Sequence, residues 1–409
     1  DGGLFVPESL PDLSGELDSW KGKNYPDLCT AFFRHFATDI PTDELKTLIV
    51  DAYLRFDHAQ HAPLVKLDEK IDILELFHGP TLAFKDFALQ LLGKFYERQV
   101  ILSGESINVL GATSGDTGAA AISGLLGKPG VNIFILYPDG RVSPLQERQM
   151  TCTEASNVYP LCVTGSFDDA QAALKEVFGD KAFSQSVSLS AVNSINLARV
   201  LAQCVYYIYA WLQLPDTRRA KTTFVVPTGN FGNVLAGWAA WKCGLPIDRL
   251  VIGTNSNDIL FRFFETGEMK MAGVAPTLSP SMDIQVSSNF ERLLFDMLDG
   301  DGAAVRKWIA DFRETGSVSV DDARLAAAHE KFDAARLDDD GTRRVIREIY
   351  ETTGELLDPH SAIGVDAARQ CRGDRSIPMI SLATAHPAKF PDAVKAATGF
   401  HPALPDRMA

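Results

Sequence analysis

The sequence lacks several features that would assign it to a specialised class of protein. It has only six cysteines in 409 residues, without paired metal-ligand spacing, and these are too few to stabilise a chain of this length as a disulfide framework. No stretch approaches the roughly 20 apolar residues of a membrane helix, and the first residues lack the pattern of a signal peptide. We therefore expect a cytoplasmic protein with reduced, mostly buried cysteines, no metal site and no membrane partner.

Positive charge is also scarce. The formal net charge of −14 argues against general nucleic-acid binding, although local positive pockets for an anionic ligand are compatible with it. The motifs G-x-G-x-x-G and G-x-x-x-x-G-K-[ST], which bind nucleotides, are both absent. We expect a small-molecule ligand, no nucleic-acid partner, and a monomer or homodimer.

Short apolar runs alternate with helical patterns along the chain. Five runs rich in Val and Ile are typical of buried parallel strands; they cover residues 106–110, 131–137, 223–226, 250–253 and 377–382. With 46% hydrophobic residues the chain can also fill a large core. These patterns predict an α/β protein with two parallel-sheet domains.

Several helix boundaries are visible in the sequence. Ser143 and Gln146, with Pro144 between them, form a capping box. Ser166 begins a similar S-x-x-D signal before 170–178, and apolar residues spaced by three or four predict a long helix from Leu197 to Leu212.

The section from about 261 to 375 differs from the rest. It is richer in charge and mostly helical in pattern, so we interpret it as an elaboration of the second sheet domain. Its acidic run 338–341 predicts a solvated turn rather than a metal site.

A lysine in an unusual setting introduces the chemistry. The segment F-H-G-P-T-L-A-F-K-D at 77–86 leads into a predicted helix with Thr81 as its N-cap and Lys85 in its first turn. The helix dipole and the apolar neighbours disfavour a charged amine there. Such an amine suits Schiff-base formation with an aldehyde. The local pattern agrees equally well with a lysine that extends to the surface.

Two glycine-rich segments each lie between a predicted strand and a predicted helix. The segment V-P-T-G-N-F-G-N at 226–233 would turn backbone N–H groups toward a phosphate. The segment G-A-T-S-G-D-T-G at 111–118 could hold a second anion, such as a carboxylate. Taken singly, both patterns also occur as turns without a ligand.

These segments together resemble the threonine synthases of the bacterial and fungal type. The resemblance covers nearly the whole chain in the family's order. It includes D-G-G-L-F-V-P-E at 1–8, G-R-V-S-P at 140–144, N-S-I-N-L-A-R at 193–199, T-N-S-N-D at 254–258, D-P-H-S-A at 358–362 and T-A-H-P-A-K-F at 384–390. Related sequences usually carry a short segment before D-G-G, and its absence here bears only on the expected N-terminal packing.

The resemblance implies the fold of tryptophan synthase β and the cofactor pyridoxal 5′-phosphate (PLP). Lys85 would be the catalytic residue and would carry the cofactor. The cofactor phosphate would be bound by the amides of Gly229, Asn230, Phe231, Gly232 and Asn233. Thr384 would face the pyridine nitrogen with a neutral hydroxyl, and Asp116 would lie near the phenolic oxygen.

The resemblance also implies a set of substrate-binding residues. Thr81 belongs to this set, and Ser114, Gly115 and Thr117 would receive the substrate carboxylate. We expect the substrate phosphate around Ser194, Asn196 and Arg199, because a helix N-terminus and a guanidinium both attract anions. The alternative is that Arg199 forms a surface ion pair beside polar helix caps.

The activity implied is that of a PLP-dependent carbon–oxygen lyase acting on phosphate, which converts O-phospho-L-homoserine and water into L-threonine and phosphate. Alternatives are a PLP-dependent phospho-lyase or dehydratase that releases 2-oxobutyrate, or a non-catalytic binding protein with this fold. The expected domains are an N-terminal domain at 1–75, a large PLP-binding domain at 76–102 and 197–409, and a small mobile domain at 103–196.

Overall fold

The computed structural model describes residues 3–165 and 167–408. The first two residues of the D-G-G motif and the predicted cap Ser166 lie outside this described part. The chain groups into two compact units. Unit 1 comprises residues up to Lys23, Ala62–Glu75 and Gln203 onward, and unit 2 comprises Asn24–His61 and Leu76–Ala202. The three predicted domains remain a prediction.

Unit 1 is built on a six-stranded sheet in the order β1-β2-β12-β7-β8-β11. Every neighbouring pair is parallel except β1 and β2. The strands are β1 (Leu64–Lys66), β2 (Ile71–Glu75), β7 (Thr222–Pro227), β8 (Ile247–Thr254), β11 (Phe332–Arg336) and β12 (Met379–Ala383), and β9 (Glu268–Lys270) and β10 (Ser317–Ser319) form a separate antiparallel pair.

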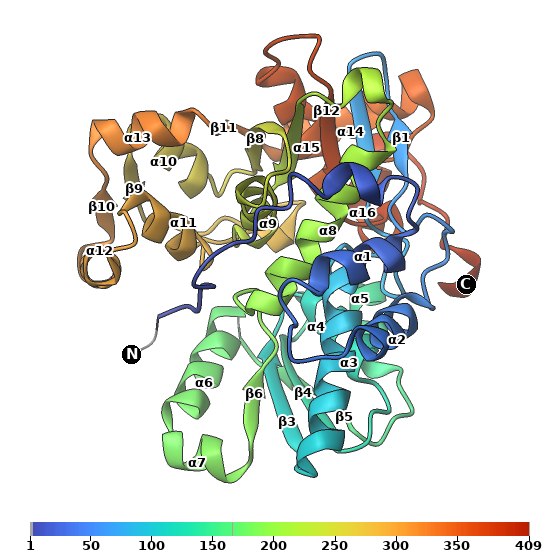
Figure 1. Ribbon diagram of the computed structural model, residues 1–409, viewed down its shortest axis with the longest axis vertical. Helices are drawn as coiled ribbons and strands as arrows, with labels where there is room; N and C mark the ends of the chain where they lie inside the picture. Colours follow the sequence, from blue (N-terminus) through green and yellow to red (C-terminus); the bar gives the residue numbers. More distant parts are fainter. Residues whose placement is uncertain (1–2, 166, 409) are drawn as a thin grey trace. The chain divides into compact units, whose positions relative to one another are not determined.

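Helices cover both faces of this sheet (Figure 1). On one face, Val225 and Val251 join a core with residues of α14 (Asp339–Thr353) and α15 (Pro359–Gln370). On the other, Phe224 packs edge-on against Tyr207 of α8 (Leu197–Gln213), with 4.9 Å between ring centroids. The helices of unit 1 are α9 (Gly232–Lys242), α10 (Ile259–Thr266), α11 (Phe290–Met297), α12 (Gly302–Thr315), α13 (Asp322–His329), α14 (Asp339–Thr353), α15 (Pro359–Gln370) and α16 (Pro391–Thr398), with single 3₁₀ turns at Leu17–Trp20, Asp216–Arg218, Pro280–Met282, Pro387–Lys389 and Asp406–Met408.

Unit 2 contains a parallel four-stranded sheet in the order β5-β4-β3-β6. Val109, Ile133 and Ile135 of this sheet pack in one core with apolar residues of α3 and α4. Its elements are α1 (Tyr25–Phe33), α2 (Thr42–Tyr53), α3 (Lys85–Ser103), β3 (Ile107–Ala112), α4 (Asp116–Leu125), β4 (Val131–Pro138), α5 (Pro144–Thr151), β5 (Val158–Val163), α6 (Phe167–Gly179), α7 (Lys181–Ser186) and β6 (Leu189–Ala191). Helix α8 (Leu197–Gln213) begins in unit 2 and continues in unit 1.

The predicted α/β class with parallel sheets is confirmed, and the five predicted strands appear as β3, β4, β7, β8 and β12. The capping box at α5 is also confirmed, because the Ser143 and Gln146 side chains each bond the other's backbone N–H group. The section 261–375 is mostly helical, as expected, but contains β9, β10 and β11. Since β11 is an edge strand of the main sheet, this section contributes directly to that sheet.

Two local predictions were wrong or only partly right. The run 338–341 is no turn, because the Asp338 carboxylate accepts a hydrogen bond from Gly341 N–H at 2.8 Å and caps α14. The cysteines are all free, yet Cys152 and Cys162 are exposed and Cys371 is only partly buried.

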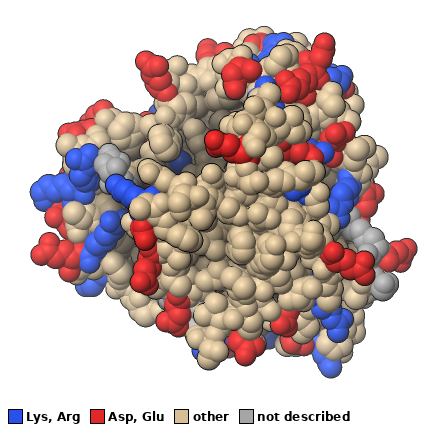
Figure 2. All heavy atoms as spheres, turned by 90° about the horizontal axis from the view of Figure 1, so that it is seen from below, with Lys and Arg blue, Asp and Glu red and all other residues tan. Residues whose placement is uncertain are grey.

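Within the described residues, no helix is long and apolar enough to span a membrane, and no group of three His, Cys, Asp or Glu side chains could hold a metal ion. On the face shown in Figure 2, Lys and Arg side chains lie in separate groups among Asp and Glu, around an uncharged middle.

Candidate active site

The predicted site residues fall into two groups. Unit 2 carries Thr81, Lys85, Ser114, Gly115, Asp116, Thr117, Ser194, Asn196 and Arg199, and unit 1 carries Thr384 and the loop 229–233.

Lys85 is the first residue of α3, so the predicted position in the first turn is right. Its side chain is 12% exposed, and its amine lies 3.4 Å from Oδ2 of Asp116. The amine is also 5.2 Å from the centroid of the Phe84 ring. The alternative of a lysine that extends to the surface is therefore wrong.

The turn before α3 is organised by Asp86 rather than by Thr81. The cap position belongs to Phe84, which makes no side-chain capping bond, so the predicted Thr81 cap was wrong. The fully buried Asp86 carboxylate instead accepts bonds from Thr81 N–H and Oγ1–H, both at 2.8 Å. Leu82 has a φ of 64°, and a Cβ on Gly79 would lie 2.4 Å from Asp86. The turn that delivers Lys85 is thus strained and closely packed.

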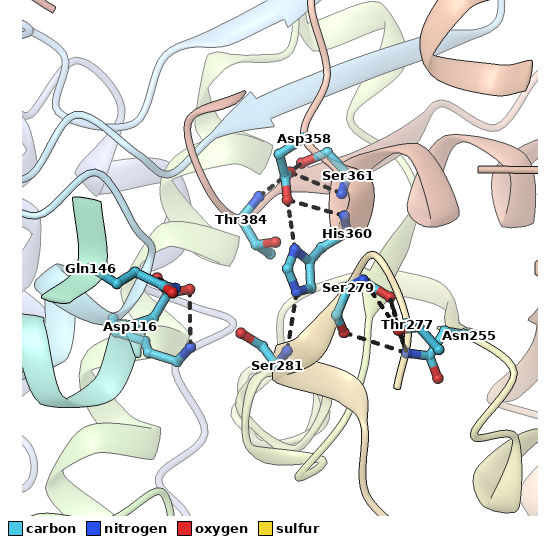
Figure 3. Close-up of polar contacts among 11 residues, drawn as sticks. Asp116, Gln146, Asn255, Thr277, Ser279, Ser281, Asp358, His360, Ser361 and Thr384 are labelled. Carbon is cyan, nitrogen blue, oxygen red and sulfur yellow. Dashed lines mark hydrogen bonds and ion pairs between the residues drawn. The ribbon is translucent and has the colours of Figure 1, made fainter. Parts of the chain in front are cut away.

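Asp116 is held from two sides (Figure 3). It is the first residue of α4, and its Oδ1 accepts a 2.9 Å hydrogen bond from Nε2 of Gln146 while Oδ2 faces Lys85. Oε1 of Gln146 accepts from Ser143 N–H at 3.0 Å, as part of the capping box. Gly115 has a φ of 135°, and a Cβ there would come within 2.4 Å of Gln146. The orientation of Asp116 therefore depends on the start of α5.

In the segment 113–118, which ends in the first turn of α4, two backbone N–H groups bond a side chain of the same segment. Oγ1 of Thr113 accepts hydrogen bonds from Gly115 N–H at 3.0 Å and from Gly118 N–H at 2.8 Å. Ser114 and Thr117 remain partly exposed. The loop thus combines a side-chain-stabilised turn with two hydroxyls that a ligand can reach.

Helices α3 and α4 approach each other through a glycine pair. A Cβ on Gly93 would lie 2.1 Å from the carbonyl oxygen of Gly124, and a Cβ on Gly124 would lie 2.4 Å from that of Leu89. Neither position has room for a side chain, so the two backbones are in direct contact.

Arg199 is buried at 2% exposure near the start of α8. The Asn196 side chain accepts a hydrogen bond from Ala198 N–H at 2.9 Å and so caps the helix, as the alternative interpretation proposed. The other half of that alternative, a surface ion pair for Arg199, is wrong because of its burial. Arg199 also opposes the effect of burial that raises the pKa of the Tyr96 hydroxyl.

In unit 1, the loop 229–233 connects β7 to α9. Ser287 Oγ–H donates to the Gly229 carbonyl at 2.8 Å, and the backbone and side chain of Asn289 donate to the Asn230 carbonyl at 3.2 and 3.1 Å. In a trans peptide the next N–H group points opposite to the carbonyl. The amides of Asn230 and Phe231 therefore point away from 287–289, and Phe231 has a φ of 60° that continues the turn.

The Asn233 side chain anchors the start of α9 to α8. Its Oδ1 accepts hydrogen bonds from the hydroxyls of Tyr206 at 2.6 Å and Tyr207 at 2.9 Å. Burial raises the pKa of Tyr207 well above its ordinary value, which keeps it a donor. Oδ1 of Asn233 thus positions the helix, and the backbone N–H of this residue remains a candidate for phosphate binding.

Thr384 directly follows β12, at the carboxyl end of a central strand, where ligand contacts are common in parallel sheets. It is 5% exposed, and its N–H group donates to Oγ of Ser361 at 3.2 Å.

The T-N-S-N-D motif holds a neighbouring segment in place. Nδ2 of Asn255 lies 2.8 Å from Thr277 Oγ1 and 3.0 Å from Ser279 Oγ (Figure 3). It also lies 2.8 Å from an Asp283 carboxylate oxygen. Burial raises the pKa of the Asp283 carboxyl, while the hydrogen bonds from Thr277 and Asn255 oppose that rise. The motif is therefore part of the scaffold for 277–283.

Comparison with known proteins identifies the family. The chain matches the model of the threonine synthase N terminus at residues 1–53, that of pyridoxal-phosphate dependent enzymes at 62–310, and that of the threonine synthase C-terminal region at 361–409. It is 48% identical to the threonine synthase of Pseudomonas aeruginosa, over 100% of this chain and 88% of that protein. The chain belongs to the threonine synthase family. The predicted resemblance and the PLP cofactor are thereby confirmed.

Two further threonine synthases support the same family assignment. The protein of Saccharomyces cerevisiae is 45% identical over 98% of this chain and 85% of its own length. The crystal structure of PLP-bound threonine synthase from Brucella melitensis superposes with a TM-score of 0.95 at 48% identity, covering 100% of this chain and 89% of that one. The tight turn at Phe231 and the outward amides of the loop 229–233 suit the phosphate of such a cofactor.

Several side chains that hold the predicted site residues were not predicted from the sequence. They are Asp86, Gln146, Ser287, Asn289, Asp358, His360 and Ser361. Gln146 carried a local signal, the capping box, and Asp86, Asp358, His360 and Ser361 lie in segments that carry the family resemblance. None of these signals indicated which site residue each side chain contacts.

Proposed function

We propose that this chain converts O-phospho-L-homoserine and water into L-threonine and phosphate, the last step of threonine biosynthesis. The observation that carries the proposal is the Lys85 amine, held at a helix start 3.4 Å from Asp116 in a chain of this family. PLP, when bound, withdraws electrons so that the substrate's α-proton becomes acidic.

The chain's own residues would divide the work. Lys85 would attach the cofactor aldehyde and then move protons at the α-carbon of the substrate. Asp116, fixed by Gln146, would orient that amine and lie near the phenolic oxygen of the cofactor. Amides of the loop 229–233 would bind the cofactor phosphate, and Thr384 would face the pyridine nitrogen.

The substrate needs two further anion sites. Ser114, Gly115 and Thr117 would receive its carboxylate, and Thr81, whose side chain is held by Asp86, would also contact the substrate. Ser194, Asn196 and Arg199 would bind its phosphate, since a buried guanidinium needs an anionic or hydrogen-bonding environment. Movement of the predicted small domain, 103–196, would exclude water while the phosphate leaves from the γ-carbon.

Product analysis tests the proposal. The holoenzyme is incubated with O-phospho-L-homoserine, and threonine, 2-oxobutyrate and phosphate are quantified, with K85A as the inactive control. Equal amounts of threonine and phosphate are expected. Release of 2-oxobutyrate with phosphate would indicate the phospho-lyase or dehydratase instead, and no product from a PLP-loaded protein would indicate a binding protein.

The proposal includes a cytoplasmic enzyme that is a monomer or homodimer, binds no nucleic acid and needs no metal. The net charge of −14 and the free cysteines support these assignments. Sedimentation of the purified holoenzyme measures the oligomeric state.

A further inference from the structure

A buried carboxylate in unit 1 receives more hydrogen bonds than helix capping requires. Asp358, at 0% exposure, caps α15 by accepting from His360 N–H and Ser361 N–H, each at 3.0 Å. It also accepts from Nδ1–H of His360 at 2.6 Å and from Oγ–H of Ser361 (Figure 3). The two side-chain bonds leave the carboxylate fully engaged and fix both neighbouring side chains.

The first of these side chains leads to Thr384. Ser361 Oγ has a single proton, which is donated to Asp358, so its lone pairs remain to accept. It accepts the N–H group of Thr384 at 3.2 Å. The backbone of Thr384 is therefore held in place by Asp358 through one hydroxyl.

The second side chain leads toward the loop 229–233. Because Nδ1–H of His360 donates to Asp358, its Nε2 is an acceptor in the neutral ring. Nε2 accepts from Ser281 N–H at 3.4 Å. The carbonyl oxygen of Ser281 in turn packs against Gly229, where a Cβ would lie only 2.8 Å from it. Asp358 thus also supports the segment against which Gly229 rests.

We propose that Asp358, with His360 and Ser361, is a positioning unit for the cofactor site. A single buried carboxylate sets the place of Thr384 through Ser361 and the place of the 280–282 segment beneath Gly229 through His360. This inference rests on the roles proposed above for Thr384 and the loop 229–233. A residue that merely caps α15 would need only the two backbone bonds.

Asp358→Asn removes one of the two acceptor oxygens of this unit, and with it one backbone and one side-chain bond. Asn caps helices about as well as Asp, but its amide nitrogen cannot accept, so it cannot serve both His360 and Ser361. The Kd of the apoprotein for PLP should rise about ten-fold, the size of one lost hydrogen bond to a charged group. The absorption spectrum of the bound cofactor should also change. The matched control is Asp338→Asn, at the exposed cap of α14, which should keep both the Kd and the spectrum of the unmodified chain.

Ser361→Ala then tests the connection from Asp358 to Thr384, and His360→Phe tests the connection from Asp358 to Ser281. Ser361→Ala releases Thr384 and should alter the spectrum more than the Kd, whereas His360→Phe should raise the Kd with a smaller spectral change. Circular dichroism of each apoprotein reports folding. Should Asp358→Asn fail to fold, Ser361→Ala alone carries the test.

Wild-type affinity and an unchanged spectrum in Asp358→Asn, or in Ser361→Ala where Asp358→Asn does not fold, would overturn the inference. These measurements need PLP but no substrate. A wild-type protein that binds PLP yet makes no threonine would contradict the proposed function and still leave the positioning unit open to the same test.

Discussion

The starts of α4 and α9 follow the same pattern in sequence but differ in charge. Each helix follows a parallel strand and a glycine-containing loop. The first turn of α4 contains the acidic residue Asp116, whereas the first turn of α9 contains no acid. A helix N-terminus attracts anions. At α4 the Asp116 carboxylate already occupies this favourable position, whereas at α9 the position remains open to an anionic ligand. A glycine loop in a sequence therefore indicates an anion site only after the local charge is counted.

The two loops also differ in what holds them. The α4 loop is fixed from nearby, by Thr113 within the loop and by Gln146 at the next helix. The α9 loop is fixed by Ser287 and Asn289, more than fifty residues further along the chain. We expect damage to the α4 loop to affect chemistry at Lys85, and damage to the α9 loop to affect cofactor affinity.

Removal of the amine beside the α4 start should have the largest effect. Lys85→Ala should abolish the absorption of covalently attached cofactor and lower turnover by at least about a thousand-fold, because the nucleophile is lost. Lys94→Ala is the control, since Lys94 lies on the same helix and pairs with Asp51 and Glu97. A yellow, active Lys85→Ala protein would exclude Lys85 as the attachment site.

Alanine at the two loop glycines sharpens the comparison. Gly229→Ala places a methyl group against Ser281 and should raise the Kd for PLP by roughly ten-fold to a hundred-fold, the cost of one or two lost hydrogen bonds. Gly115→Ala displaces Gln146 and should lower kcat with little change in that Kd. Gly302→Ala, at an open position, is the control. If both loop variants lost PLP equally, the proposed division between the loops would be wrong.

The start of α8 offers a third way to bind an anion, through a cation. Arg199→Ala should lower kcat/KM for O-phospho-L-homoserine by roughly ten-fold to a hundred-fold, because a charge-assisted hydrogen bond of ~1.5–3 kcal/mol is lost. Cofactor absorption should persist. Unchanged kinetics together with lower thermal stability would show that Arg199 serves the fold and that the substrate phosphate binds elsewhere.

Asp116→Asn should have the smallest effect, and it makes the start of α4 electrically similar to that of α9. The amide oxygen can still accept from Gln146, but the charge opposite Lys85 disappears. We expect kcat to fall by about ten-fold or less and the PLP Kd to stay constant. Steady-state kinetics and a PLP titration measure the two quantities. A large loss of PLP affinity would contradict the proposed division, in which the α4 loop affects chemistry and the α9 loop affects cofactor affinity.

Local patterns were sufficient to predict much of this molecule. The five Val- and Ile-rich strands, the capping box at Ser143 and the first-turn position of Lys85 each depend on residues close together in sequence. The prediction of Thr81 as the N-cap was wrong because Asp86, only five residues away, accepts hydrogen bonds from both the backbone N–H and the hydroxyl of Thr81.

Long-range contacts were beyond the reach of such patterns. The short strand β11 joins the main sheet only because β8 lies beside it, and its sequence F-D-A-A-R lacks a clear apolar run. Likewise, the bond between Gln146 and Asp116 joins residues thirty positions apart. The scaffold of the candidate site had to come from the structure, whereas the proposed reactive amine, Lys85, was selected from the sequence.

The contact between Gly93 and Gly124 has a consequence for how this enzyme can be engineered. About 12 Å of helix separates Gly93 from Lys85, at a rise of 1.5 Å per residue. A side chain at either glycine would force the two backbones apart and change the angle between α3 and α4. The distance between the Lys85 amine and the Asp116 carboxylate would then increase, although neither residue had been substituted. A library of variants restricted to residues around Lys85 and Asp116 would omit Gly93 and Gly124, although their contact fixes the distance between α3 and α4.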